Sequence, residues 1–425
     1  MTEKLLQFIW QFQYFNKQSL TTDDGSALNV LHPGQLNTNQ GPDFSQGKIK
    51  INDTVWAGNI ELHLKSSDWH LHNHSTDKNY NNVILHVVWQ NDATIPDVNG
   101  QNIPTLELQP YVSKILLQKY EQLMQNQGFV PCENYLPVLS GIAWFSWKER
   151  LAIERLMRKA KEVLVLLKES NDHWEEVFWW MLAKNFGIPV NAEAFQNIAR
   201  SVSINILAKH KNQLHQLEAL LLGQAGLLNG DFTDDYPIML QKEYRFLSKK
   251  YSLQPINKEP AFLRMRPANF PTVRLAQLAM LINQSTHLFS RIKDAKTVAE
   301  VQVLLTVTAN DYWHYHYTFN ESTPYSPKSL GKQMANNIII NTVIPVLFAY
   351  GVNRNEQKWK DIPVKWLLQL PPEQNTITRK WKEKEVLNQN AMDSQALIEL
   401  KKNYCDKRIC LDCAVGNKIL PSAGK

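Results

Sequence analysis

GPDFSQGKIKINDTVWAGNIELHLKSSDW, residues 41–69, is the stretch that decides how the first part of the chain folds. Toward its end, apolar and polar side chains alternate, and the polar set is Glu61, His63 and Lys65. Side chains two positions apart share one face of a β-strand, so we expect these three groups on one face of a sheet. Asp43 precedes Glu61 by 18 residues and follows Pro42, and a proline biases the residue before it toward the extended backbone of a strand entry.

Segments on both sides of this stretch predict a mixed sheet. ALNVLHP (27–33), NVILHVVWQ (82–90) and TLELQP (105–110) are rich in Val, Ile and Leu, and helical patterns occur near residues 4–15 and 112–127. The expected order is helix, three strands, a His-rich connection and further strand. If GKIKI pairs with NIELHLK across a turn within INDTVWAG, Asp43 and Glu61 approach each other, and two such carboxylates can hold Mg²⁺ with several water molecules.

At Pro42, Asp43 and Glu61 the sequence resembles the PD-(D/E)xK nuclease superfamily. Its core has the order α-β-β-β-α-β, with an Asp near the start of the second strand and an acidic-x-Lys motif on the third. The resemblance implies Mg²⁺-dependent hydrolysis of phosphodiester bonds in DNA or RNA, with Asp43 and Glu61 as metal ligands. One position departs from the motif, because His63 stands two residues after Glu61 and the lysine, Lys65, comes two residues later on the same face. Lys65 or His63 is then expected to position water or to stabilise the transition state.

Two other interpretations remain open for the same region. An amphipathic strand with a solvated polar face explains the alternation without any chemistry, and the protein is then a non-catalytic scaffold that binds nucleic acid or protein through a degenerate nuclease-like sheet. A zinc site is the second alternative, with His70, His72 and His74 on one strand face and Asp77 as a further ligand. The alternative to this zinc site is an ordinary His-rich loop that binds no metal. The core helix of the nuclease superfamily often adds an acidic residue, and Glu3 is the early candidate.

Composition limits the class of protein. The chain has 425 residues, 44% of them hydrophobic and 20% charged, as in ordinary globular proteins. Its net charge of +6 permits a nucleic-acid partner without requiring one. We expect no transmembrane helix, because the most apolar stretch, NNIIINTVIPVLFAYG, is short and contains Asn and Pro. The N-terminus resembles an amphipathic helix, and four cysteines make no disulfide framework, so we expect a cytoplasmic protein.

The character of the sequence changes near residue 141. We expect a nuclease-like α/β domain at residues 1–125, a helical domain at 141–260, and a mostly helical region at 261–425 that ends in a cysteine cluster. The fold class is therefore α+β. The pattern SWKERLAIERLMRKAKEVLVLLKES predicts a long amphipathic helix with Ser146 as its N-cap, and its mixed charges indicate a salt-bridged surface rather than a nucleic-acid-binding ridge.

Two further motifs suggest binding sites. RMRPANFPTVR contains Arg264 and Arg266, whose guanidinium groups suit phosphate oxygens, although an interdomain ion-pair anchor explains them equally well. Cys405, Cys410 and Cys413 have the spacing C-x4-C-x2-C, which is typical of Zn²⁺ or iron–sulfur ligands.

Cys132 is the remaining cysteine and the candidate fourth ligand. Some PD-(D/E)xK nucleases carry an iron–sulfur staple made by one distant and three C-terminal cysteines, which is similar in layout though not in spacing. The alternative is a set of thiols that bind nothing.

Taken whole, the chain resembles an uncharacterised bacterial family, domain-of-unknown-function family 2851. The resemblance runs through the motifs GPDF, GNIELH, SSDWHLH, NVILHVVW, LLGQAGLL and RMRPANFPTVR and through the terminal cysteines. It implies a stand-alone bacterial protein and supplies no activity. It also leaves the oligomeric state open.

Overall fold

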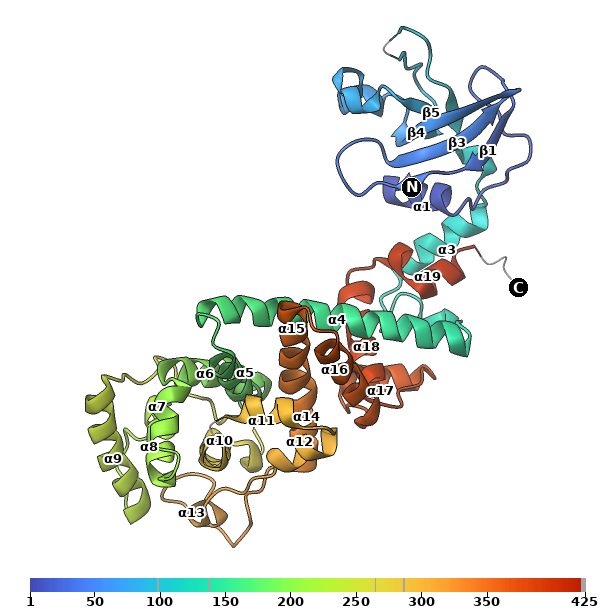
Figure 1. Cartoon of the computed structure of the whole chain (residues 1–425). Coiled ribbons are helices and arrows are strands. Elements are labelled where there is room, and N and C mark those ends of the chain that lie inside the picture. The colour runs from blue at the N-terminus through green and yellow to red at the C-terminus, as the bar shows by residue number, and fades with distance from the viewer. Residues whose placement is uncertain (98, 137, 264, 286, 422–425) are drawn as a thin grey trace. The chain divides into compact units, whose positions relative to one another are not determined.

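The computed structural model describes residues 1–97, 99–136, 138–263, 265–285 and 287–421. The chain divides into two compact units: unit 1 is Met1–Trp144 with Leu400–Lys425, and unit 2 is Phe145–Glu399. The segment from Leu400 onward thus belongs with the N-terminal part, and most of the expected ranges 141–260 and 261–425 fall together in unit 2. The fold class is α+β, as predicted, with a curled mixed sheet first and a mostly helical region after it (Figure 1).

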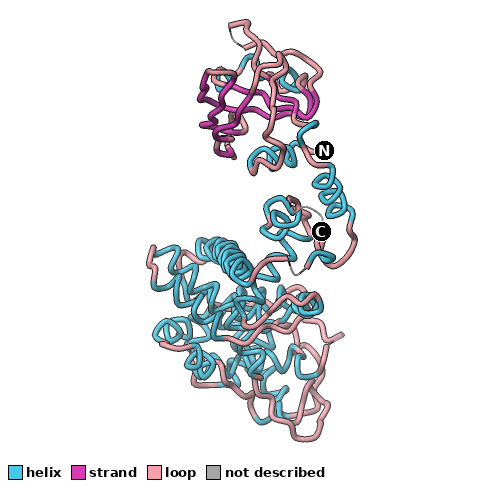
Figure 2. Tube along the Cα trace, turned by 90° about the vertical axis from the view of Figure 1, so that its right-hand side faces the viewer, coloured by secondary structure: helices cyan, strands magenta, loops and turns pink. Residues whose placement is uncertain are grey.

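Unit 1 is built on a six-stranded sheet (Figure 2). Its strands are β1 (Leu28–His32), β2 (Gln35–Leu36), β3 (Phe44–Ile51), β4 (Thr54–Lys65), β5 (Val83–Gln90) and β6 (Thr105–Glu107). The order in the sheet is β1-β3-β4-β5-β6, and β2 pairs with β3. The pairs β1–β3, β2–β3 and β3–β4 are antiparallel, whereas β4–β5 and β5–β6 are parallel. The parallel β5 brings a second set of side chains beside those of β4.

The β3–β4 hairpin fixes the register that matters for the candidate site. Ile51 pairs with Thr54 across a turn at Asn52, whose positive φ of 51° suits the left-handed conformation that tight hairpin turns require. At the other end of the hairpin Phe44 pairs with Ile60, so the preceding Asp43 comes beside Glu61.

The described residues of unit 1 also form four complete α-helices, of which α1 and α2 contact β4 of the sheet. They are α1 (Glu3–Gln11), α2 (Asp68–Leu71), α3 (Lys114–Gln125) and α19 (Ala414–Ile419). Helix α1 packs against β4 and buries Leu5, Leu6, Phe8, Ile9 and Trp10. Short helical turns at His74–Thr76 and Lys78–Tyr80 follow α2 and lead into β5.

Unit 2 is mainly helical. Its helices are α4 (Gly141–Glu169), α5 (Trp174–Phe186), α6 (Ile188–Ser201), α7 (Ile204–Lys209), α8 (Leu214–Gln224), α9 (Asp235–Tyr251), α10 (Pro271–Gln284), α11 (Leu288–Asp294), α12 (Val298–Leu304), α13 (Asp311–His314), α14 (Lys332–Ile338), α15 (Ile344–Arg354), α16 (Lys358–Gln369), α17 (Thr376–Glu383) and α18 (Ala391–Glu399). The first residues of α4 belong to unit 1, because the unit boundary falls after Trp144.

Helix α4 begins earlier than its sequence pattern predicts. Ser146 is an interior residue, so the prediction of Ser146 as N-cap is wrong. The backbone N–H of Ala143 lies 3.4 Å from the Ser140 hydroxyl, and the N–H of Trp144 donates to the Ser140 carbonyl at 2.9 Å. Ser140 therefore starts the helix, because it offers the first turn both a side-chain and a backbone acceptor.

A continuous helix from Lys332 to Arg354 runs through the core of unit 2. By length and composition alone it could cross a membrane, but 78% of its most apolar window is buried within the structure, as is typical of a core helix. Between α14 and α15 the residues Ile339–Val343 form a π-helical turn. Pro345 lies just after this turn and has no N–H to donate, so the regular ladder of α-helical hydrogen bonds is broken there.

Candidate functional site

Asp43 and Glu61 lie side by side and are fixed by hydrogen bonds. The backbone N–H of Asp43 donates to Oε2 of Glu61 at 2.9 Å, and the N–H of Leu62 donates to Oδ2 of Asp43 at 3.2 Å. From α1, the side-chain amide of Gln7 donates to Oδ1 of Asp43 at 2.9 Å. The hairpin and α1 together hold the two carboxylates in one orientation, as a metal site requires.

These carboxylates form an acidic cluster with Glu3. Burial, followed by the charge of Glu61, raises the pKa of Asp43 to about 7. The pKa of Glu3 is also raised, chiefly by burial and further by the charge of Glu61. Three carboxyl groups from α1, the start of β3 and β4 thus repel one another, and a bound cation removes that repulsion.

A row of imidazoles continues from the carboxylates. Nδ1 of His63 lies 2.8 Å from Nε2 of His86, and Nε2 of His63 lies 3.1 Å from Nδ1 of His72. His63 reaches His86 because the parallel register of β4 and β5 sets His86 opposite Glu61. Burial lowers the pKa of His63 to about 2 and that of His86 to about 3, so both rings are neutral, which is the form that binds metals.

Glu61 joins the carboxylates to the imidazoles. Its Oε1 lies 3.6 Å from Nε2 of His63 and 3.3 Å from Nε2 of His74. His63, His72 and His74 each offer one ring nitrogen within 4.8 Å of the other two. For metal–ligand bonds of about 2.0–2.1 Å, tetrahedral geometry places neighbouring ligand atoms about 3.3 Å apart. The measured separations of 3.1, 3.3 and 3.6 Å match that spacing.

Two nitrogens of this cluster lack hydrogen-bond partners among the described residues. They are Nε2 of His74, which lies near Glu61 without hydrogen-bonding geometry, and Nδ1 of the fully buried His86. Leaving buried polar atoms unpaired is costly, and such atoms are rare in proteins. A cation at the centre of the cluster satisfies Nε2 of His74 directly. It also fits His63, which can bind through Nε2 while its Nδ1–H donates to His86.

The structure places the other predicted ligands differently. The prediction that His70, His72 and His74 share a strand face is wrong, because residues 68–71 form the helical turn α2. His70 is exposed on that turn, and Asp77 accepts the backbone N–H of Asn79 at 2.9 Å. The buried His63, instead of His70, joins His72 and His74 in the cluster.

Lys65 lies at the exposed end of β4. The backbone N–H of Lys65 donates to the carboxylate of Asp68 at 2.9 Å. In the described part of the chain, its amine makes no hydrogen bond to Asp43 or Glu61. A role for Lys65 in catalysis stays a prediction.

The arginine motif is only partly described. Arg264 lies outside the described residues, and Arg266 is exposed beside the short turn Pro267–Asn269. A third arginine of the same motif, Arg274, is instead buried in α10.

The four cysteines converge within unit 1. Cys132, Cys405, Cys410 and Cys413 line one small cavity of about 10 Å³, and none of them forms a disulfide. The C-terminal segment reaches this place because Arg408 donates to three backbone carbonyls at the end of α3, including that of Asn126 at 2.7 Å. A cavity of this size holds about one water molecule or one ion.

Cys132, Cys410 and Cys413 are buried, Cys405 is half-buried, and the four thiols influence one another. Burial, together with the neighbouring Cys413 and Cys410, raises the pKa of Cys132 to about 12. Burial also raises the pKa of Cys405, Cys410 and Cys413. Four thiols that resist ionisation together are the donor set that a cation such as Zn²⁺ converts to thiolates.

The backbone around the cavity is also closely packed. A Cβ atom placed on Gly416 would lie 2.0 Å from the carbonyl oxygen of Cys410, so this position accepts only glycine without rearrangement. The close approach of Gly416 helps to hold Cys410 and Cys413 around the same space.

Comparison with known proteins identifies the family. Residues 3–376 match the family model described as "Protein of unknown function (DUF2851)". No curated protein and no solved structure gives a significant match. Because the family model covers more than half of the chain, the protein belongs to the DUF2851 family.

Proposed function

We propose that this DUF2851 protein is a metal-dependent hydrolase of phosphodiester bonds in DNA or RNA, with its metal centre in unit 1. The single observation that carries the proposal is the convergence of Asp43, Glu61, His63, His72 and His74 on one place, with ring nitrogens left unpaired. A solvated strand face does not explain it, because Glu61 is 5% exposed and His63 is 1% exposed. The amphipathic-strand interpretation requires those side chains to face water.

The order of elements supports a nuclease-type site. Helix α1, the antiparallel strands β1, β3 and β4, the helical turn α2 and the parallel strand β5 follow the order α-β-β-β-α-β. Asp43 stands at the entry of β3, Glu61 lies within β4, and Glu3 supplies the acidic residue of the first helix. The departure from the superfamily motif remains, with His63 at the position of the lysine.

The donor set determines which metal the site would hold. Carboxylates suit hard cations such as Mg²⁺ and Mn²⁺, whereas imidazoles suit Mn²⁺, Zn²⁺ and other transition metals. Asp43, Glu61 and Glu3 would hold the hard cation, and His63, His72 and His74 would favour a softer one. When bound, the metal lowers the pKa of a water molecule and polarises a phosphoryl oxygen.

The side chains around the metal have separate tasks in this proposal. Glu61 and Asp43 act as ligands, and the backbone hydrogen bonds that already fix their carboxylates keep them oriented. His86 holds the ring of His63 in place from behind, at 2.8 Å. Lys65, exposed at the end of β4, is available to contact a phosphate of the substrate and to offset its charge.

The protein is tested as a nuclease by digestion of plasmid, single-stranded DNA and RNA with Mg²⁺, Mn²⁺ or Zn²⁺ and with a chelator. We expect cleavage with at least one metal and none with the chelator. Asp43→Asn should abolish cleavage, whereas Asp53→Asn, at an exposed carboxylate in the turn of the same hairpin, should leave it unchanged. Cleavage that persists in Asp43→Asn would show that a contaminating enzyme or another site is responsible.

The competing function is a non-catalytic scaffold that binds nucleic acid or protein. It predicts equal binding with metal and with chelator, and no cleavage under any metal. Filter binding of a labelled oligonucleotide, carried out beside the digestion, distinguishes the two functions. Metal-independent binding without cleavage would contradict the proposed hydrolase and favour the scaffold function.

A second, structural metal is supported by the cysteine cavity. We propose that Cys132, Cys405, Cys410 and Cys413 bind one Zn²⁺ or an iron–sulfur cluster that fastens the C-terminal segment to unit 1. The cavity of about 10 Å³ is closer in size to a single Zn²⁺ than to a cluster, and the thiols must move closer together to bind either, because among the described residues the group whose ligand atoms lie within 4.8 Å of one another is His63, His72 and His74. Elemental analysis and visible absorption of anaerobically purified protein decide between zinc, iron and neither.

A further inference from the structure

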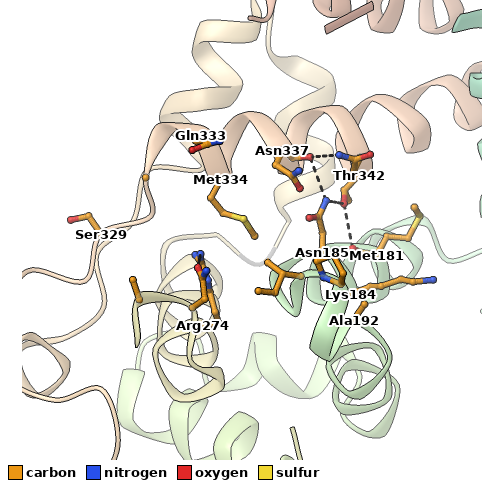
Figure 3. Close-up of a pocket in the computed structure, with 16 residues that line it drawn as sticks. Met181, Lys184, Asn185, Ala192, Arg274, Ser329, Gln333, Met334, Asn337 and Thr342 are labelled. Atoms are coloured by element: carbon orange, nitrogen blue, oxygen red, sulfur yellow. Dashed lines mark hydrogen bonds between the residues drawn. The ribbon is translucent and has the colours of Figure 1, made fainter. Parts of the chain in front are cut away.

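Unit 2 contains a pocket that is separate from the candidate metal site of unit 1. Its volume is about 790 Å³, which is within the usual range of small-molecule sites. The walls come from α5, α6, α10 and the α14 helix with its π turn. In Figure 3, Arg274 rises from α10 and Met334 descends from α14 toward the same space.

Arg274 is the unusual residue of this pocket. It is only 8% exposed, yet in the described part of the chain it forms no ion pair. Its guanidinium donates to Oε1 of Gln277 at 3.0 Å and to Oδ1 of Asn269 at 2.5 Å, and its Nε has no partner among the described residues. Guanidinium carries five N–H donors, so neutral amide oxygens leave both its charge and part of its donor set unsatisfied.

The rest of the lining does not supply the missing negative charge. None of the residues that line the pocket is Asp or Glu, and a second cationic residue, the exposed Lys184, lies on its wall. Burial lowers the pKa of Arg274 to about 10, which leaves it protonated at neutral pH. The pocket is therefore electropositive, and the guanidinium of Arg274 in its lining has a charge that no described carboxylate balances.

The pocket also has an amide-rich wall. Asn185 donates from α5 to the carbonyl of Asn337 at 3.4 Å and to the hydroxyl of Thr342 at 3.1 Å, as Figure 3 shows. Thr342 donates in turn to the carbonyl of Met181 at 3.3 Å. Amides fixed in this way are suited to hydrogen-bond an organic ligand, and the Met181 and Met334 side chains provide apolar surface for the rest of it.

The geometry points to a binding site for a small organic oxyanion, a molecule that bears a phosphate or carboxylate group, with that group on Arg274. A bare inorganic ion fills little of a space of about 790 Å³, so the ligand carries further atoms that contact the amide and methionine walls. This inference is independent of the metal centre in unit 1. It also assigns a binding role within the arginine motif to the buried Arg274.

Calorimetric titration of the full-length protein tests the inference. The probes are pyrophosphate and adenosine monophosphate for phosphate ligands, citrate for carboxylate ligands, and inorganic phosphate as the smallest anion. We expect adenosine monophosphate or citrate to bind more tightly than pyrophosphate or inorganic phosphate, and Arg274→Gln should weaken that binding by at least about tenfold, since it removes a charge-assisted contact. Which probe binds identifies the anion class.

Thermal unfolding without ligand separates binding from a structural role. Because Arg274 has no carboxylate partner, Arg274→Gln should melt at or above the temperature of the parent protein. The matched control is Arg155→Gln, since Arg155 is equally buried but pairs with Glu399 at 3.3 Å. That control should melt at a lower temperature and retain anion binding. Absence of heat for every probe at about 10 mM, or undiminished binding by Arg274→Gln, would overturn the inference.

Discussion

Each unit buries a glutamate, but the surroundings of the two side chains are opposite. In unit 2, Glu218 is fully buried and accepts hydrogen bonds from Tyr236 at 2.8 Å, Trp313 at 3.0 Å and Asn310 at 2.6 Å. Donors therefore meet both of its oxygens. A buried carboxylate that is satisfied in this way belongs to the architecture of the fold.

In unit 1, Glu61 is almost as buried, but one of its oxygens faces groups that are not established donors. Its Oε2 accepts the N–H of Asp43, whereas its Oε1 lies near the ring nitrogens of His63 and His74 without a hydrogen bond. A buried acceptor that lies beside ring nitrogens without a hydrogen bond contributes little to stability. The contrast is that the Glu218 network of unit 2 is satisfied by hydrogen bonds, whereas the network around Glu61 leaves Nε2 of His74 and Nδ1 of His86 unpaired among the described residues.

The largest expected effect is on activity in unit 1. Glu61→Gln keeps the shape of the side chain and removes its charge. We expect metal-dependent cleavage to fall roughly 100-fold or more, a loss on the order of 3 kcal/mol in transition-state stabilisation, because Glu61 contacts both halves of the site. Initial rates of plasmid nicking measure the loss. The melting temperature of the metal-free variant should equal that of the parent protein, because the substitution relieves the repulsion between carboxylates. A large drop in melting temperature would contradict the contrast drawn between Glu61 and Glu218.

Glu218→Ala should lower stability and leave cleavage unchanged, which is the reverse of the effect expected for Glu61→Gln. It leaves the donors of Tyr236, Trp313 and Asn310 buried without an acceptor, so unfolding should become easier by roughly 2–4 kcal/mol. Denaturant titration measures this loss. Cleavage per folded molecule should not change, since Glu218 and the metal centre lie in different units. Unaltered stability would show that the unit 2 network is not structural.

The pH dependence of stability should report on a buried carboxyl group in each unit, because the pKa of Asp43 and that of Glu218 are both raised to about 7. Burial raises the pKa of Glu218 from its ordinary value of 4.5 to about 7. A carboxyl group whose pKa is raised on folding contributes most stability below its unfolded pKa, and that contribution is lost as pH rises through the folded value. We expect stability to fall between about pH 4.5 and 7, by roughly 2–3 kcal/mol.

The control for this slope is Glu218→Gln, which cannot titrate. Its stability should fall less steeply over the same pH window, and the slope that remains should include the contribution of Asp43, whose pKa is also raised to about 7. A parent protein whose stability rises steadily from pH 4.5 to 7 would contradict the assignment. Denaturant midpoints measured at each pH provide the test.

The smallest expected effect concerns the support of the metal site. His86 contacts His63 at 2.8 Å and is too far back to be grouped with the three metal-facing imidazoles. His86→Gln should therefore weaken binding of Zn²⁺ or Mn²⁺ by about tenfold, while His74→Gln, at a direct ligand, should weaken it more. Titration with the metal alone measures both constants. Equal losses in the two variants would place His86 among the ligands themselves.

Much of unit 1 can be predicted from local sequence. The alternating pattern predicts β4, and its bounds, Thr54–Lys65, coincide with the segment TVWAGNIELHLK. The expected pairing of GKIKI with NIELHLK is wrong, because residues 47–51 pair with residues 54–58 across the tight turn at Asn52. Asp43 and Glu61 are nevertheless adjacent, because Phe44 pairs with Ile60 at the other end of the hairpin. The cysteine spacing likewise indicates a common site before the fold is known.

The prediction fails where local pattern cannot place a side chain. His70 looked equivalent to His72 and His74 in the sequence, but the turn α2 directs it into solvent. Glu3 and His86 reach the site only through the packing of α1 and the parallel register of β5. No signal within residues 59–65 indicates that His86, 23 residues after His63, will contact it.

Sequence alone determined the elements, the fold class and the chemical types of the candidate ligands, because hydrophobic periodicity and turn residues act over a few neighbouring positions. Tertiary structure decided which histidines meet Glu61, which arginine is buried without a carboxylate partner among the described residues, and that the segment from Leu400 belongs with unit 1. Those contacts join residues far apart in the chain. They depend on how whole elements pack, and the packing is set by the summed burial of many side chains rather than by any single motif.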